Sequence, residues 1–245
     1  MNYFTNKDQE FIEDIIHKTF IEIDRVYSNS LNINETDIIL SGSRLIFPKY
    51  SSSNKTNPDK LRVSEQELRF AFVEIFSKKC ESTNSRYYYS IETPTEEKYI
   101  FSEKVTIGKN YPRKADEQDL CNNKGESARF DLTIYNSEHK RICLIEFKNN
   151  DSDPDNYKKD FLKLSTEGSG CLCYFIDLIE ASDSGTLIKG IMPRIKLVDK
   201  EFFKGVTYIA HCIINRGEKG FKTVYDGSLV IGDEWEKVNL YNQLT

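Results

Sequence analysis

Two apolar segments separated by a polar turn most constrain the fold of this chain. Residues 129–135 and 142–148 are rich in Ile, Leu, Phe, Tyr and Thr, and residues 136–141 between them are all polar or charged. Residues of these types favour strands, and a short polar stretch between two strands favours a turn. The second segment is apolar on both faces, which is typical of a central strand. The sequence therefore predicts an antiparallel hairpin inside a larger sheet.

The register of this hairpin decides which polar side chains meet. With the turn centred between Glu138 and His139, Asp131 lies opposite Glu146. Lys148 shares the face of Glu146 because side chains alternate along a strand. A shift of one residue would separate the two carboxylates, since it moves every side chain of one strand to the other face. On this register, two carboxylates and one ammonium meet at the end of a buried strand.

Such a trio has two explanations. Surface strands often carry acidic and basic residues, so the three side chains can simply form a solvated face. Alternatively, Asp131 and Glu146 bind a divalent cation, because close carboxylates repel each other and Mg²⁺ takes oxygen ligands. The Phe147 carbonyl could supply a further oxygen, and Lys148 could orient or deprotonate a metal-bound water. This second arrangement would support metal-assisted phosphodiester hydrolysis.

The pattern resembles the PD-(D/E)xK nuclease superfamily, which includes restriction endonucleases, Holliday-junction resolvases and repair nucleases. The resemblance rests on Asp131 in one strand and the Glu-Phe-Lys segment 146–148 at the end of the next, and it covers about residues 61–180. Phe130 stands where the family often has a proline. The resemblance implies a restriction-endonuclease-like core: a helix, a three-stranded meander, a second helix and a further strand. It also implies Mg²⁺ or Mn²⁺ as the cofactor.

The family's first helix usually carries another acidic residue, for which this sequence has two candidates. A helix is predicted from Ser64, and Glu67 follows it at the spacing of the resolvase serine and active-site glutamate. By this resemblance Glu67 helps to hold the metal. The same spacing is that of a capping box, in which Glu67 would only bind the Ser64 amide. Glu65, on the side of Leu68 and Phe72, is the second candidate.

The rest of the chain predicts an α/β protein with a mixed central sheet, elaborated at both ends. Residues 1–60 are expected to form an N-terminal extension of one helix and a loop, and residues 181–245 a β-rich extension packed on the core 61–180. Ahead of the hairpin, two strands over 87–91 and 99–107 are expected to turn around a proline.

Basic residues flank the predicted site on two segments. Residues 108–128 are polar and without periodicity, which is typical of a functional or disordered loop. A helix predicted over 156–166 carries several lysines. We expect these residues to contact nucleic-acid phosphates, a solvated surface being the alternative. The set comprises Lys109, Arg113, Lys114, Arg129, Lys158, Lys159 and Lys163.

Charge and cysteine usage bound the compartment and the partners. The net charge of −5 is unfavourable for nucleic-acid binding, but residues 1–40 carry the whole acidic excess, so a basic groove elsewhere is compatible with it. The six cysteines lack metal-site spacing, and no signal peptide or membrane-length apolar run occurs. We therefore expect a cytoplasmic protein with reduced thiols and no membrane partner.

Together these features predict a Mg²⁺- or Mn²⁺-dependent endonuclease that hydrolyses DNA, in phage defence or DNA repair. Two alternatives stay open: a catalytically silent module of the same fold in a defence or regulatory system, and an enzyme that cleaves RNA. Cutting both strands of a duplex would need two active sites, hence a homodimer or two binding events. A partner protein of a defence system is a further expectation.

Overall fold

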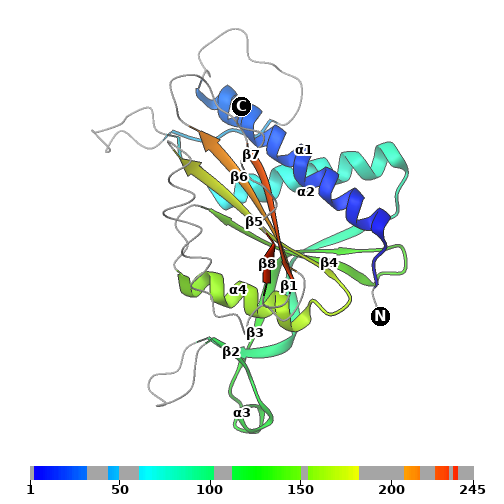
Figure 1. The fold of residues 1–245 in the computed structure, drawn as a ribbon, viewed down its shortest axis with the longest axis vertical. Helices are drawn as coiled ribbons and strands as arrows, with labels where there is room; N and C mark the ends of the chain where they lie inside the picture. Colours follow the sequence, from blue (N-terminus) through cyan, green and yellow to red (C-terminus); the bar gives the residue numbers. More distant parts are fainter. Residues whose placement is uncertain are drawn as a thin grey trace, which may run out of the picture.

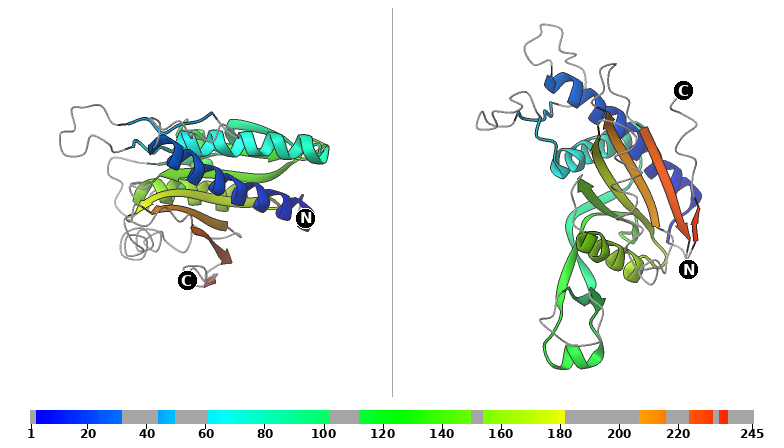
Figure 2. Two further views of the ribbon diagram at one scale, coloured as in Figure 1. Left: turned by 90° about the horizontal axis from the view of Figure 1, so that it is seen from above. Right: turned by 60° about the vertical axis from the view of Figure 1, so that its left-hand side comes forward.

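A mixed β-sheet with helices on both faces forms the body of the protein (Figures 1 and 2). The computed structural model describes residues 3–31, 44–49, 61–101, 112–149, 154–181, 207–215, 224–231 and 234–236. The elements in chain order are α1 (Asn6–Leu31), α2 (Glu65–Thr83), β1 (Tyr88–Ile100), β2 (Arg113–Lys114), α3 (Glu117–Cys121), β3 (Glu126–Tyr135), β4 (Arg141–Asn149), α4 (Pro154–Glu167), β5 (Leu172–Ala181), β6 (Thr207–Asn215), β7 (Val224–Ile231) and β8 (Glu234–Glu236).

The described strands form one sheet in the order β2-β1-β3-β4-β5-β6-β7-β8. β1, β3 and β4 are antiparallel neighbours, and β5 and β6 each add in parallel. A parallel pair needs a crossover, and α4 provides the one from β4 to β5. β7 and β8 continue the sheet with antiparallel pairing. The predicted α/β class with a mixed sheet is therefore confirmed.

The predicted register of the β3–β4 hairpin is confirmed. Towards the turn, one irregularity lies between Ile134 and Tyr135. On the far side of this irregularity from the turn, the pairs follow the register predicted for a turn centred between residues 138 and 139. In this register Asp131 lies next to the strand segment that carries Glu146. The paired residues are Leu132 with Ile145, Thr133 with Leu144 and Ile134 with Cys143.

Alternation along β4 sends Ile145 and Phe147 to one face of the sheet and Glu146 and Lys148 to the other. Leu132, Ile145 and Phe147 belong to the core cluster that also contains residues of α1 and α2. The ring of Phe147 meets that of Phe72 on α2, with centroids 5.6 Å apart. Figure 1 shows α1 and α2 together on one side of β4 and β5, and α4 on the other side. The polar residues of β4 therefore face α4.

Phe72→Ala is expected to lower the free energy of unfolding by about 3–5 kcal/mol, because Phe72 is fully buried and truncation leaves a cavity. Urea denaturation measures this loss. Phe70→Ala is the matched control, since the Phe70 side chain on the same helix is 63% exposed and its removal should change stability by less than about 0.5 kcal/mol. Equal losses in the two variants would contradict the placement of α2.

The prediction of two strands turning at Pro94 was wrong, because a single strand, β1, spans this region. β1 runs along β3 from the pair Tyr88–Tyr135 to the pair Tyr99–Glu126, with an irregularity between Pro94 and Lys98. Proline lacks an amide donor and is tolerated at such bulges, so it interrupts the ladder without reversing the chain. Part of the second expected strand lies outside the described residues.

The prediction of a structureless loop over 108–128 was also wrong for residues 112–128, the part that the structure describes. Residues 112–128 form β2, α3 and the start of β3, which make an arm that projects from the body (Figures 1 and 2). A capping box between Asp116 and Asp119 starts α3, and Arg113 pairs with the Asp119 carboxylate. The acidic residues of this segment therefore have a structural role that composition alone did not reveal.

Candidate functional site

The structure brings Asp131 of β3 close to Glu146 and Lys148 of β4, the two strands of the hairpin. The Phe147 amide donates a 2.7 Å hydrogen bond to Oδ2 of Asp131, so this carboxylate is fixed against β4. Asp131 directly precedes Leu132, the first residue of β3 that pairs with β4. Glu146 is only 1% exposed, whereas ionised carboxylates are rarely buried without a partner. A solvated face therefore does not account for this residue.

Arg69 on α2 is the partner of Asp131, and sequence reasoning missed it. Its guanidinium lies 2.6 Å from Oδ1 of Asp131, 2.8 Å from Glu92 and 3.3 Å from Glu65. Glu65 stands one helical turn before Arg69, so both side chains leave α2 on one side. One cation is thus surrounded by three carboxylates.

Four side chains of β4 and α4 form a chain of ion pairs with alternating charge. Nζ of Lys163 lies 2.6 Å from Glu146 and 2.9 Å from Asp160. The other oxygen of Asp160 lies 2.8 Å from Nζ of Lys148. Residues 146 and 148 share one face of β4, and residues 160 and 163 share one face of α4, so the two elements can pair at two points. This ion-pair chain fixes the side chains of Glu146 and Lys148.

The structure separates the two candidate carboxylates of α2. Oγ of Ser64 donates to the Glu67 carboxylate, and Arg62 lies 3.8 Å from it. The side chain of Ser64 makes no capping hydrogen bond, so the two residues contact each other by their side chains. Glu65 instead contacts Arg69 through the same guanidinium nitrogen that binds Asp131. Of the two glutamates, Glu65 is therefore the one that shares a partner with Asp131.

Carboxylates outnumber cations in this region, and burial shifts their titration. Burial is the main cause that raises the pKa of Glu65 and, well above its usual range, that of Glu146. Burial would lower the pKa of Lys148, but the charges of Asp160, Glu146 and Asp131 raise it, so Lys148 is an ammonium. The carboxylates are Glu65, Asp131, Glu146, Asp160 and Asp177, and the cations are Arg69, Lys148 and Lys163.

Asp177 on β5 is a further buried acid that sequence reasoning did not single out. It pairs with Lys148 in the parallel register of β4 and β5, and it accepts a 3.1 Å hydrogen bond from the hydroxyl of Tyr157. Burial raises the pKa of Asp177 to about 7, the Tyr157 and Lys148 interactions lower it, and the charge of Glu65 raises it. The available signal was an acid inside a strongly apolar strand.

Asp177 should make the stability of the protein depend on pH. A carboxyl whose pKa is higher in the folded than in the unfolded state stabilises the fold fully below the unfolded value, and this contribution is lost as pH rises through the folded value. We therefore expect Asp177→Asn to flatten the fall in stability between the unfolded value of 3.8 and about pH 7. Urea denaturation at several pH values measures the slope, and identical slopes would contradict the assignment.

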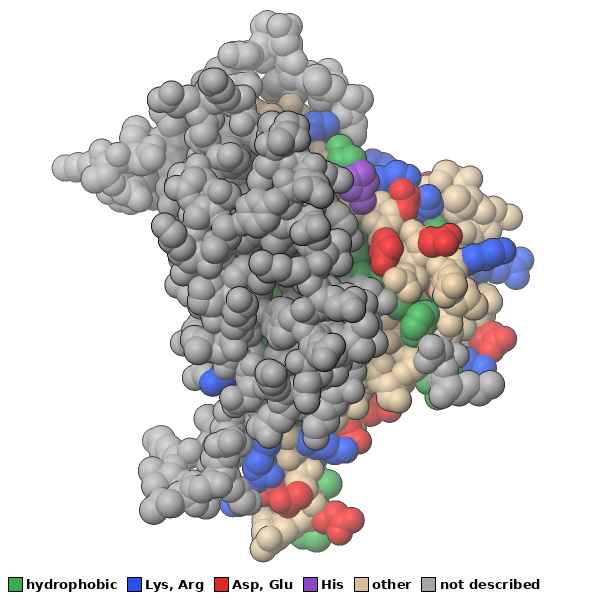
Figure 3. All heavy atoms as spheres, viewed as in Figure 1, with side chains coloured by type: hydrophobic (Ala, Val, Ile, Leu, Met, Phe, Trp, Pro, Cys, Tyr) green, Lys and Arg blue, Asp and Glu red, His purple; other side chains and the backbone are tan. Residues whose placement is uncertain are grey.

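The basic residues predicted to contact phosphates have different surroundings. Lys163 is buried against Glu146 and Asp160, so it does not line a surface, contrary to expectation. Arg113 and Lys114 pair with acids of the arm and β1, and Figure 3 shows basic and acidic side chains mixed on the arm. Arg129 is largely exposed, with Glu92 at 3.9 Å. The remaining residues are Lys158 and Lys159 on α4, and Lys109, which lies outside the described residues.

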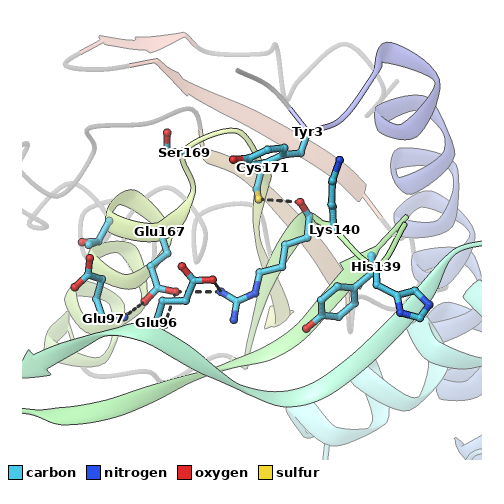
Figure 4. A pocket seen from close by; sticks show the side chains of 11 residues that line it. Tyr3, Glu96, Glu97, His139, Lys140, Glu167, Ser169 and Cys171 are labelled. Carbon is cyan, nitrogen blue, oxygen red and sulfur yellow. Dashed lines mark hydrogen bonds and ion pairs between the residues drawn. The ribbon is translucent and has the colours of Figure 1, made fainter. Parts of the chain in front are cut away.

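A separate pocket of ≈ 680 Å³ lies at the other end of the hairpin, where β4 and β5 begin (Figure 4). Glu167, which lines this pocket, accepts 3.0 Å hydrogen bonds from the backbone amides of Glu96 and Glu97 and from the hydroxyl of Tyr99. Arg141 pairs with both Glu96 and Glu167. These contacts hold the irregular part of β1, so the charged groups of the pocket serve the fold.

The acids of the site fit a hard divalent cation by their chemistry, because carboxylate oxygens are the ligands that Mg²⁺ prefers. Apart from the exposed pair of Glu92 and Arg129, five acidic groups meet three cations here, and burial raises the pKa of three of the acids, so a divalent ion would stabilise their ionised forms. In the described part of the chain no three acidic, histidine or cysteine side chains are grouped closely enough to hold a metal. Asp131 and Glu146 instead contact Arg69 and Lys163.

In comparisons with known proteins, no family model, no curated protein and no solved structure matches the chain. Among the described helices, none has the length and apolar character needed to cross a membrane.

Proposed function

We propose that the protein is a Mg²⁺- or Mn²⁺-dependent endonuclease that hydrolyses DNA phosphodiester bonds. The observation that carries the proposal is the excess of acidic groups over cations around Asp131 and Glu146, beside the fixed ammonium of Lys148. Burial disfavours the ionised forms of three of these acids, which are Glu65, Glu146 and Asp177. A divalent cation would stabilise those ionised forms, which gives the acids a reason beyond folding.

The order of elements supports this proposal. α2, the meander β1-β3-β4, the crossover helix α4 and the parallel strand β5 follow one another as the resemblance implies for a restriction-endonuclease-like core. Asp131 stands on the second strand of the meander, and Glu146 and Lys148 stand near the carboxyl end of the third. Ligand sites of open α/β sheets commonly lie at such strand ends.

Each residue has a separate role in this proposal. Asp131, Glu146 and Glu65, in place of Glu67, would have to come closer together to hold the divalent cation, because the structure does not group three such side chains closely enough among the described residues. When bound, the cation would polarise the phosphoryl oxygen and make hydroxide available near neutral pH. Lys148 would orient the attacking water and stabilise the charge that develops on the phosphate, because the ion pair with Asp160 holds it as a donor. Arg129 is the exposed cation nearest to these groups along β3 and would contact the nucleic-acid backbone.

A nuclease assay tests the proposal. Purified protein is incubated with supercoiled plasmid, linear duplex, single-stranded DNA and RNA, each with Mg²⁺, Mn²⁺ or EDTA. Cleavage of DNA with either metal and none in EDTA would support the proposal, and cleavage of RNA alone would assign the enzyme to RNA. If no substrate is cut with any metal, the endonuclease proposal fails.

A catalytically silent module of the same fold is the second candidate, and one observation favours it. The carboxylates of Asp131 and Glu146 already have cationic partners, Arg69 and Lys163, at 2.6 Å each. A silent module would keep these pairs and bind no metal. The melting temperature in Mn²⁺ and in EDTA separates the two candidates. An ion that binds the folded state raises the melting temperature by mass action, so only a metal-binding protein should melt at a higher temperature in Mn²⁺.

A further inference from the structure

We infer that Arg69 is a resident counter-ion at the candidate metal site, which a divalent cation displaces from Asp131 when it binds. This inference rests on the proposed function and deepens it, because it concerns how the same site is held in the absence of metal. The first observation that supports the inference is the position of Arg69. Its guanidinium contacts both Glu65 of α2 and Asp131 of β3, so it joins two carboxylates from different elements.

The contacts of Arg69 have the character of a cation site. Three carboxylates surround a side chain that is only 10% exposed, and Oδ1 of Asp131 accepts its shortest contact, at 2.6 Å. Oδ2 of the same carboxylate is committed to the Phe147 amide. A metal ligated by Asp131 through Oδ1 would therefore contact the atom that Arg69 now binds. Two cations at one oxygen repel each other strongly where water is excluded, so the two modes of binding compete.

The fold also provides a place for the displaced guanidinium. Glu92 lies 2.8 Å from Arg69 and its side chain is 47% exposed, at the surface of β1. Arg69 can therefore leave Asp131 and keep a carboxylate partner beside solvent. Glu65, one turn earlier on α2, stays in place as a ligand for the incoming ion. Arg69 would thereby stabilise the metal-free protein and weaken its affinity for the divalent cation.

Titration with Mn²⁺ in a calorimeter tests the inference, with Ca²⁺ as a second probe. We expect Arg69→Met to bind Mn²⁺ at least about tenfold more tightly than the unaltered protein, and Arg69→Lys to behave like the unaltered protein because it keeps the charge. Adding Asp131→Asn to Arg69→Met should remove the gain. Arg62→Met is the matched control: Arg62 is half exposed and lies 3.8 Å from Glu67, away from Asp131.

The outcomes distinguish this inference from the proposed function. If the unaltered protein binds Mn²⁺ and Arg69→Met binds it equally or more weakly, the resident counter-ion is refuted and the metal site stands. If neither protein binds Mn²⁺, both ideas fail. Should Arg69→Met not fold, nitrogen-15 NMR of the unaltered protein replaces it: the Arg69 side-chain resonance must shift on addition of Ca²⁺, and an unchanged resonance during saturable Ca²⁺ binding would refute the displacement.

Discussion

Lys163→Met is expected to lower the free energy of unfolding by about 3–5 kcal/mol, the cost of breaking a buried ion pair by removing one partner. Lys163 is 6% exposed and contacts both Glu146 and Asp160, so its loss leaves two buried carboxylates without their shared cation. Methionine nearly matches the volume of the lysine stem, so the packing around α4 is retained. Urea denaturation at pH 7 measures the change.

A second variant separates lost charge from lost packing. Combining Lys163→Met with Glu146→Gln removes one of the orphaned charges, and it should recover part of the stability, because neutral groups are less costly to bury. Lys18→Met is the surface control, since its ion pair with Asp14 is exposed and should contribute less than about 1 kcal/mol. A loss below about 1 kcal/mol for Lys163→Met itself would show that the ion pairs of Lys163 do not form in solution.

Asp131→Asn is expected to reduce metal-dependent DNA cleavage about a hundredfold or more. A bound metal supplies several kcal/mol of transition-state stabilisation, and each 1.4 kcal/mol corresponds to a factor of ten in rate. Asparagine keeps the shape of the side chain and can still accept the hydrogen bond from the Phe147 amide. The fold should therefore survive, and kcat/KM on plasmid DNA in Mg²⁺ measures the effect.

The two glutamates of α2 supply the controls for this experiment. Glu65→Gln should also lower cleavage, because Glu65 shares the guanidinium of Arg69 with Asp131 and so lies beside it. Glu67→Gln should retain cleavage, because the Glu67 carboxylate contacts Ser64 and Arg62. The opposite pattern would return the helix carboxylate to Glu67, as the serine spacing predicted. Cleavage by Asp131→Asn at the unaltered rate would remove Asp131 from the site.

Local patterns predicted the hairpin and its register, because alternation of side chains is a property of the strand itself. The polar turn 136–141 fixed how Asp131 and Glu146 face each other, and the structure agrees with that register. Helical periodicity accounts for the burial of Leu68 and Phe72 on one side of α2 in the same way. By contrast, Pro94 was misjudged because strand pairing with β3 outweighs a local preference for a turn.

The sequence by itself determined which β4 residues share a face, and only the tertiary structure decided what they contact. Arg69 and Asp131 are 62 residues apart, and Lys163 reaches Glu146 only because α4 crosses back over β4. No spacing rule links such residues, since their contacts depend on the packing of separate elements. The same packing puts Glu65 against Arg69, whereas Glu67 contacts Ser64 and Arg62. Charge pairing in this buried region is therefore a property of the assembled sheet and helices.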